Sequence, residues 1–258
     1  MPSLRPLPTS FYRRDTAVVA RDLLGCRLVR RFPGGEKRAV VIVETEAYLG
    51  EKDRAAHTWN GRRTPRVAPM WGPGGHAYVY FVYGMHFCLN VVTGREGVPE
   101  AVLLRAGVPE ELYFSDMRRL LMQPPIEEES ASRTSGVKGR RPLRGARSAP
   151  LTPDVRGIRS FSRRPQRGRR IAEKSSLLLA SGPAKLCAYL GITTALSGAS
   201  LSGPELMISR GPRARFDVLV GPRVGVDYSG EAAEWPLRFA IAGCPAVTRR
   251  ALLSPFGT

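Results

Sequence analysis

The chain has 258 residues, of which 43% are hydrophobic, and it carries a formal net charge of +18 at pH 7. Such a chain can bury one sizeable core, and its charge indicates a polyanionic partner such as DNA, RNA or an anionic membrane surface. No apolar run is long enough for a membrane-spanning helix, and residues 1–8 lack the apolar centre of a secretory signal.

The N-terminal part predicts one helix followed by two strands. Residues 15–25 combine an N-cap candidate, Asp15, with helical apolar spacing and a final glycine, which predicts a helix of about ten residues. Residues 26–32 and 38–43 are rich in apolar and β-branched residues, and Pro-Gly-Gly at residues 33–35 joins them.

Two carboxylates and a phenol follow the apolar run of residues 39–43. If the strand continued, Glu44, Glu46 and Tyr48 would share one face, because side chains alternate along a strand. Burial of these groups would then require compensation by water, a cation or a substrate. In the alternative interpretation the strand ends with the apolar run, and both glutamates lie in a solvated turn.

A polar loop follows at residues 55–66, with His57 and several arginines, among them Arg62 and Arg63. A carboxylate, a tyrosine, a histidine and an arginine cluster close together in the sequence favour a site for a polyanion with chemistry at its centre.

Residues 78–82 and 85–92 are rich in aromatic and β-branched residues, and Tyr83-Gly84 between them supplies a turn, which predicts a β-hairpin. A large ring at a hairpin tip has little core to reach. Tyr83 therefore either folds back on the sheet or forms a wedge offered to a partner, such as a side chain inserted between base pairs.

Residues 101–106 predict another strand, and residues 110–121 an amphipathic helix. Arg105 lies among apolar residues, where an unpaired guanidinium would be costly, so we expect it to meet a carboxylate, a phosphate or both. The alternative is an ion pair with no functional role.

The composition changes at residues 123–174, where Pro, Ser, Gly and Arg dominate and apolar periodicity vanishes. Such a segment cannot bury enough apolar surface to offset its ordering entropy, so we expect a flexible basic insertion. It is either a tolerated surface insertion or a basic arm that adds salt-sensitive DNA affinity.

The C-terminal part predicts a helix beginning at Pro183, with Lys185 near its N-terminus as a candidate phosphate contact, and short strands between residues 205 and 241. We expect one α+β domain over residues 1–258, with a curved, mostly antiparallel sheet, surrounding helices and a protruding hairpin.

The cysteines and histidines show neither a Cys-x-x-Cys pair nor metal-ligand spacing: Cys26, Cys88, Cys187, Cys244, His57, His76 and His86. We interpret the thiols as reduced packing residues of an intracellular protein and expect no metal and no cofactor.

Several motifs, in their order along the chain, resemble those of the alkyladenine (3-methyladenine, alkylpurine) DNA glycosylases. They begin with Val-Glu-Thr-Glu-Ala-Tyr-Leu-Gly and span roughly residues 20 to 245: residues 43–50, 55–57, 62–66, 78–80, 83–85, 88–90, 102–106, 181–187, 223–226 and 236–239. The resemblance also implies the α+β fold described above.

The resemblance implies that Glu46 deprotonates a water for attack at C1′ of the deoxyribose. Arg105 would orient that water and hold Glu46 ionised, and the backbone carbonyl of Val224 would complete the water site. Glu44 matches the motif but has no catalytic role in the family. The motifs that resemble the family contain no candidate lysine nucleophile, so a monofunctional glycosylase without lyase activity is expected.

The resemblance also implies a pocket for a flipped-out purine, which would stack between Tyr48 on one side and His57 with Tyr80 on the other. An electron-rich aromatic slot favours cationic alkylated purines. Asn90 at its floor is expected to disfavour the exocyclic amine of normal guanine.

The implied DNA contacts are intercalation by Tyr83 and Met85 and backbone contacts by Arg62, Arg63 and Lys185. The sequence departs from the family at His86, where a tyrosine is common, and in the long insertion. The expected partner is double-stranded DNA with damaged purines, namely 3-methyladenine, 7-methylguanine, hypoxanthine or ethenoadenine. The expected protein is a monomer in the cytoplasm, associated with the nucleoid, or in the nucleus if the source is eukaryotic.

Two other classes fit some of these observations. Paired carboxylates with aromatic residues also describe a glycoside hydrolase acting on polysaccharide, although such an enzyme does not need this positive charge. A nonenzymatic DNA- or RNA-binding module is the other possibility, and it predicts that Glu46→Gln changes nothing or tightens binding slightly by removing a negative charge.

Overall fold

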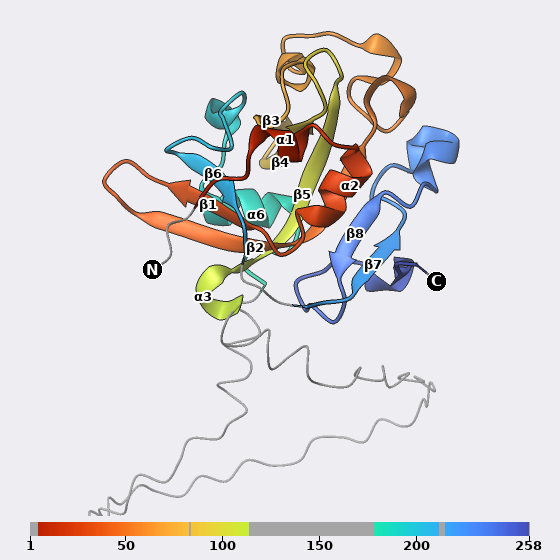
Figure 1. Ribbon diagram of the computed structural model, residues 1–258. Helices are drawn as coiled ribbons and strands as arrows, with labels where there is room; N and C mark the ends of the chain where they lie inside the picture. Colours follow the sequence, from red (N-terminus) through yellow and green to blue (C-terminus); the bar gives the residue numbers. More distant parts are fainter. Residues whose placement is uncertain (1–4, 83, 114–177, 212–214, 258) are drawn as a thin grey trace, which may run out of the picture.

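The computed structural model describes residues 5–82, 84–113, 178–211 and 215–257 (Figure 1). Its nine strands form one open sheet in the order β3-β4-β5-β2-β8-β7-β9, and β1 joins β6 to the sheet by pairing with β2. All strand pairs in the described part of the chain are antiparallel. The α+β prediction with a mostly antiparallel sheet is therefore confirmed.

The strands in chain order are β1 (Arg27–Arg31), β2 (Lys37–Tyr48), β3 (Ala77–Val82), β4 (His86–Thr93), β5 (Glu100–Pro109), β6 (Leu206–Ser209), β7 (Val218–Gly221), β8 (Arg238–Ile241) and β9 (Ser254–Pro255). The α-helices are α1 (Thr9–Tyr12), α2 (Thr16–Asp22), α3 (Glu110–Leu112) and α6 (Pro183–Leu190). Short 3-10 turns complete the described part: η1 (Gly50–Lys52), η2 (Trp59–Gly61), η3 (Ala68–Trp71), η5 (Thr194–Leu196), η6 (Asp227–Ala233) and η7 (Arg250–Leu252).

The predicted N-terminal helix is α2, which has seven residues in place of the expected ten or so and ends at Asp22, before Gly25. Its N-cap is the predicted one. The Asp15 side chain accepts a hydrogen bond from the Val18 amide at 2.9 Å, which satisfies one free N–H of the first turn. The two predicted strands that follow are β1 and β2, but β2 extends five residues beyond Val43, to Tyr48.

Strand β2 is the centre of the sheet. It pairs with β5 along one edge from Val40 to Tyr48, while β1 and then β8 pair with the other edge (Figure 1). Its apolar half contributes to the main core together with α2, and the Thr45 hydroxyl donates to the Ala20 carbonyl of α2 at 2.8 Å. Glu44 and Glu46, the neighbours of Thr45, instead contact Arg105 on β5.

The hairpin prediction is confirmed by β3 and β4, which pair in register from Ala77–Val91 to Val82–His86. The helix predicted from Pro183 is α6, which begins there and packs against β4 and β5. The expected helix at residues 110–121 begins as α3, but its continuation lies outside the described residues, as does the whole predicted insertion at residues 123–174.

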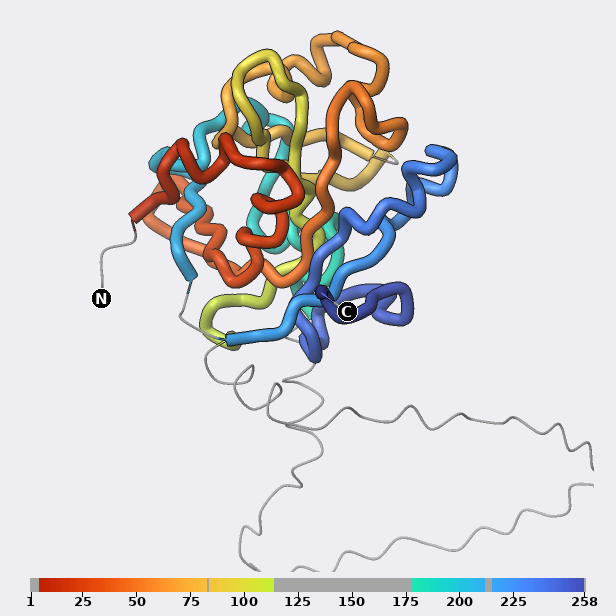
Figure 2. The backbone as a smooth tube through the Cα atoms, turned by 45° about the vertical axis from the view of Figure 1, so that its right-hand side comes forward, coloured from red at the N-terminus to blue at the C-terminus, as the bar shows by residue number. Residues whose placement is uncertain are grey.

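The C-terminal part returns to β2. Figure 2 shows the blue chain after residue 220 running beside the orange segment that follows β2. Hydrogen bonds join them, because the Arg223 guanidinium donates to the Ala47 carbonyl at 3.0 Å and to the Asp53 carboxylate. Among the described helices, none has the length and hydropathy needed to cross a membrane.

Candidate active site

Glu44 and Glu46 are both completely buried on β2, with 0% of each residue exposed. The interpretation in which they lie in a solvated turn is therefore wrong, because β2 remains hydrogen-bonded to β5 and β8 at these positions. Two register shifts between Ile42 and Thr45 make this part of the strand irregular. Such a bulge redirects side chains locally.

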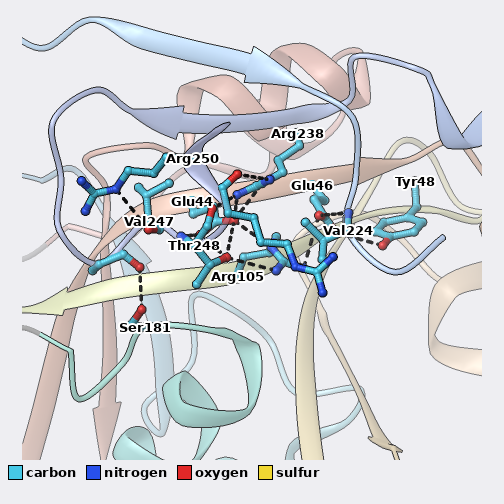
Figure 3. A network of polar contacts seen from close by, with 12 residues as sticks. Glu44, Glu46, Tyr48, Arg105, Ser181, Val224, Arg238, Val247, Thr248 and Arg250 are labelled. Carbon is cyan, nitrogen blue, oxygen red and sulfur yellow. Dashed lines mark hydrogen bonds and ion pairs between the residues drawn. The ribbon is translucent and has the colours of Figure 1, made fainter. Parts of the chain in front are cut away.

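Arg105 lies on β5 at the same irregularity, between the pairs Glu44–Ala106 and Thr45–Leu104. Its Nε lies 2.8 Å from a Glu44 oxygen, and an η nitrogen lies 3.2 Å from Oε1 of Glu46 (Figure 3). The prediction that Arg105 meets a carboxylate is confirmed, and it meets two.

Glu46 accepts contacts on both carboxylate oxygens (Figure 3). The backbone amide of Val224 donates to Oε1 at 2.8 Å, and the Tyr48 phenol donates to Oε2 at 2.9 Å. Burial raises the pKa of Glu46, and the neighbouring Glu44 raises it further. The positive charge of Arg105 and the two hydrogen bonds act in the opposite direction but do not cancel the effect of burial. Glu46 is therefore a stronger base than a solvated glutamate.

The Tyr48 ring is held next to Glu46 by a second arginine. The guanidinium of Arg223 lies 4.7 Å from the centre of the ring, in cation–π contact. Arg223 and Asp53 form a fully buried ion pair, and Asp53 also accepts from the Leu49 amide at 3.0 Å. This ion pair fixes the start of the loop after β2 against the loop that carries Val224.

The three other predicted pocket residues lie near one another. The His57 and Tyr80 rings meet edge to face with centroids 4.6 Å apart, and His57 Nδ1 lies 2.9 Å from the Tyr78 hydroxyl. Asn90 is buried, and its Nδ2 donates to the Tyr78 carbonyl across the hairpin at 3.1 Å. Sequence reasoning missed the contact between Tyr78 and His57.

Burial lowers the pKa of His57 to about 4, and the positive charges of Arg66 and Arg62 contribute to this shift. His57 is therefore neutral at physiological pH. It also lines a hollow of about 480 Å³ with aromatic and basic residues: Arg54, Trp59, Arg62 and Tyr228.

The predicted DNA-contact residues that the structure describes are all exposed. Met85 at the hairpin tip is 68% exposed, whereas Tyr83 lies outside the described residues. Arg62 and Arg63 are exposed in the loop after His57, and Arg63 stacks over Trp71 at 3.7 Å. Lys185 is exposed on the first turn of α6.

Sequence reasoning gave no role to Arg238 and Thr248, which surround Glu44 (Figure 3). Arg238 is fully buried, and its Nε donates to Glu44 Oε1 at 2.8 Å. The Thr248 amide donates to Glu44 Oε2 at 3.1 Å. A signal for Arg238 was present, because it lies in an apolar strand, as Arg105 does. Thr248 has no comparable signal.

Metal ligation has no support in the part of the chain that the structure describes. It contains no group of three or more His, Cys, Asp or Glu side chains that could hold an ion. All four cysteines are free and buried, and burial raises the pKa of the Cys187 thiol to about 12 and that of Cys244 to about 11.

The family model described as methylpurine-DNA glycosylase matches residues 10–136 and 154–245. A relative from Methanocella arvoryzae is 41% identical over 95% of this chain and 96% of its own length. Relatives from Desulfitobacterium hafniense and Bacillus cereus are 37% and 36% identical, over 92% and 94% of this chain and 95% and 98% of their own lengths. All three carry the provisional name 3-methyladenine DNA glycosylase. The chain therefore belongs to the methylpurine-DNA glycosylase family.

Proposed function

We propose that this protein is a DNA glycosylase of base excision repair that flips damaged purines out of duplex DNA and hydrolyses their N-glycosidic bond, leaving an abasic site. The observation that carries the proposal is the environment of Glu46. This carboxylate is fully buried, is held by Arg105 and the Val224 amide, and adjoins the ring of Tyr48. Family membership supports the same reaction.

The reaction needs a base for one water. Glu46 takes a proton from water, the water oxygen bonds to C1′ of the deoxyribose, and the purine leaves with the electrons of the N-glycosidic bond. The raised pKa of Glu46 suits a general base, because proton acceptance improves as the pKa approaches the working pH. The proposed contact of this water with the Val224 carbonyl is compatible with the position of that residue next to Glu46.

The pocket suits a cationic purine, because its rings are electron-rich and its histidine is uncharged. In the proposed slot the purine would stack against Tyr48 on one side and against His57 and Tyr80 on the other. A protonated histidine would repel a purine alkylated at N3 or N7. His57 does not, since its pKa of about 4 keeps it neutral.

Asn90 is proposed to limit the bases that can enter. Its side chain is buried and tied to the Tyr78 carbonyl, so it cannot easily move aside for the exocyclic amine of guanine. The proposed substrates are 3-methyladenine, 7-methylguanine, hypoxanthine and ethenoadenine in duplex DNA.

The proposed DNA surface combines the hairpin tip with basic side chains. Tyr83 and Met85 would occupy the gap left by the flipped nucleotide, and Arg62, Arg63 and Lys185 would contact phosphates. We expect the protein to act as a monomer in association with the nucleoid.

The alternative reading as a polysaccharide hydrolase requires two available carboxylates that share acid and base roles. Glu44 does not suit the second role. Its Oε1 accepts from both Arg105 and Arg238, and its Oε2 accepts from the Thr248 amide. This leaves Glu46 as the one proposed catalytic carboxylate.

The test is single-turnover release of free base from a duplex that carries one hypoxanthine or ethenoadenine, and from methylated DNA. The wild-type protein should release base, and Glu46→Gln should bind the same duplex without releasing base. Glu36→Gln is the matched control, because Glu36 is an exposed glutamate. It should behave as wild type.

Tight binding without base release by the wild-type protein would support the nonenzymatic binding module instead. Retained activity in Glu46→Gln would remove Glu46 from the mechanism. The same reactions test the absence of lyase activity, since the product strand should break only after added alkali. Breakage without alkali or a second enzyme would contradict a monofunctional mechanism.

A further inference from the structure

We propose that Glu44 and Arg238 are positioning residues for the reaction, because together they fix the orientation of Arg105 and balance the charge around Glu46. This inference rests on the proposed function for its meaning. Neither residue contacts the proposed position of the substrate, and the family resemblance gave no role to either.

The geometry gives Glu44 control over Arg105. Glu44 Oε1 accepts the Nε–H of Arg105 at 2.8 Å, which holds one edge of the guanidinium plane. Thr248 supports a second edge, since an η nitrogen of Arg105 lies 3.3 Å from its hydroxyl oxygen. The remaining η nitrogen then lies 3.2 Å from Oε1 of Glu46. A planar fork held at two edges has little freedom to rotate away from Glu46.

Arg238 compensates the buried negative charge of Glu44. In the pairing of β2 with β8, Arg238 lies directly opposite Glu46, yet its guanidinium reaches Glu44 and the Thr248 carbonyl. Three charges, from Glu44, Glu46 and Arg105, would leave a net negative charge in the core. Arg238 makes the buried set neutral, with two carboxylates and two guanidinium groups.

Several groups face Glu46 from four strands, and they differ in charge. Tyr48 and Glu44 lie on β2, Arg105 on β5, Tyr80 on β3 and Cys88 on β4. Burial raises the pKa of the three neutral groups, Tyr48, Tyr80 and Cys88, so they remain uncharged at neutral pH. Arg105 and Glu44 are therefore the charges in this set that act directly on Glu46. Arg238, opposite Glu46 on the fifth strand, β8, acts through its contact with Glu44.

Opposite changes of charge should move the activity profile in opposite directions. In Glu44→Gln the like charge beside Glu46 is lost, so the acid limb of the pH–rate profile should move to lower pH. In Arg238→Met the charge of Glu44 is less neutralised, so the limb should move to higher pH. In the double variant Glu44→Gln/Arg238→Met the set is neutral again, and the limb should return toward its wild-type position.

The plateau rate reports the positioning role separately. Glu44→Gln should lower the single-turnover plateau on the order of ten- to a hundredfold, because Arg105 loses a charged hydrogen bond. Arg238→Lys is the matched control for charge. It keeps the positive charge without the two-nitrogen contact, so it should lower the plateau and leave the acid limb in place.

The ionisation of Glu46 can also be measured without activity, by carboxyl ¹³C NMR of the folded protein, with Glu46→Gln used for assignment. Absence of base release by the wild-type protein would refute the proposed function alone. If the Glu46 carboxyl titrates at the same pH in Glu44→Gln, in Arg238→Met and in the wild type, the inference is refuted. If a single variant fails to fold, the plateau rate of the neutral double variant decides, and the inference expects it to stay below that of the wild type. A plateau rate equal to wild type in the double variant would also refute the inference.

Discussion

The buried ion pair between Arg223 and Asp53 allows a prediction about stability. In Arg223→Met the apolar part of the side chain is kept, but the buried Asp53 carboxylate loses its partner, and the carbonyls of Ala47 and Ala232 lose donors at 3.0 and 2.9 Å. Removal of one member of a fully buried pair typically costs about 3–5 kcal/mol. Asp53 keeps its backbone donors, including the Leu49 amide at 3.0 Å, so we expect a loss near the lower end of that range.

The assay is equilibrium urea unfolding, with the loss read as a lower midpoint at an unchanged slope. Arg38→Met is the control at a partly exposed arginine, which pairs with Glu36 at the surface and donates to the Tyr189 carbonyl at 2.9 Å. Each of these contacts should contribute about 1 kcal/mol or less. The double variant Asp53→Asn/Arg223→Met should lose less than the sum of its single variants, because the two side chains are in contact. A loss in Arg223→Met no larger than that in Arg38→Met would refute the reasoning.

Three further predictions concern the site and the sheet. Tyr48→Phe removes the hydrogen bond to Glu46 that favours the ionised form, so the acid limb of base release should move to higher pH, and the plateau should fall about tenfold; an unchanged profile would contradict this role. His57 has a folded-state pKa of about 4 against an ordinary value of 6.5, so the unfolded chain binds the proton first as the pH falls. The wild type should therefore lose more stability than His57→Gln between pH 6.5 and pH 4, measured as urea midpoints, and equal losses would count against a buried neutral histidine. Gly107→Ala would place a Cβ 2.7 Å from a methyl of Val40, so we expect a loss of about 1–3 kcal/mol in the same assay, and wild-type stability would show that β5 can shift.

Local features of the fold could be predicted from the sequence where short-range signals decide the structure. The cap and apolar spacing of α2 depend on residues within one turn, and the hairpin strands carry their own β-rich pattern. The full length of β2 could not be predicted in the same way. Its last residues include Glu44 and Glu46, and a charged strand end becomes stable only through partners on β5 and β8.

In the site, too, short-range signals could be predicted from the sequence and long-range contacts could not. The costly position of Arg105 in an apolar strand indicated that it needed a carboxylate, and the structure supplies Glu44 and Glu46. The sequence could not indicate which carboxylates, or that Arg238 joins them from 194 positions away. Contacts at such separation depend on the order of strands in the sheet, which no local pattern specifies.

The position of Glu46 on the central strand has a consequence for how the protein moves. At residues 44–46, β2 is hydrogen-bonded to β5 on one edge and to β8 on the other, so its amides cannot open without separating distant parts of the chain. Their hydrogen exchange should follow unfolding of the whole domain, whereas the loop at residues 55–66 should exchange by local opening. The proposed general base thus lies on a strand that opens slowly, while the loop that carries His57 can open locally without unfolding of β2.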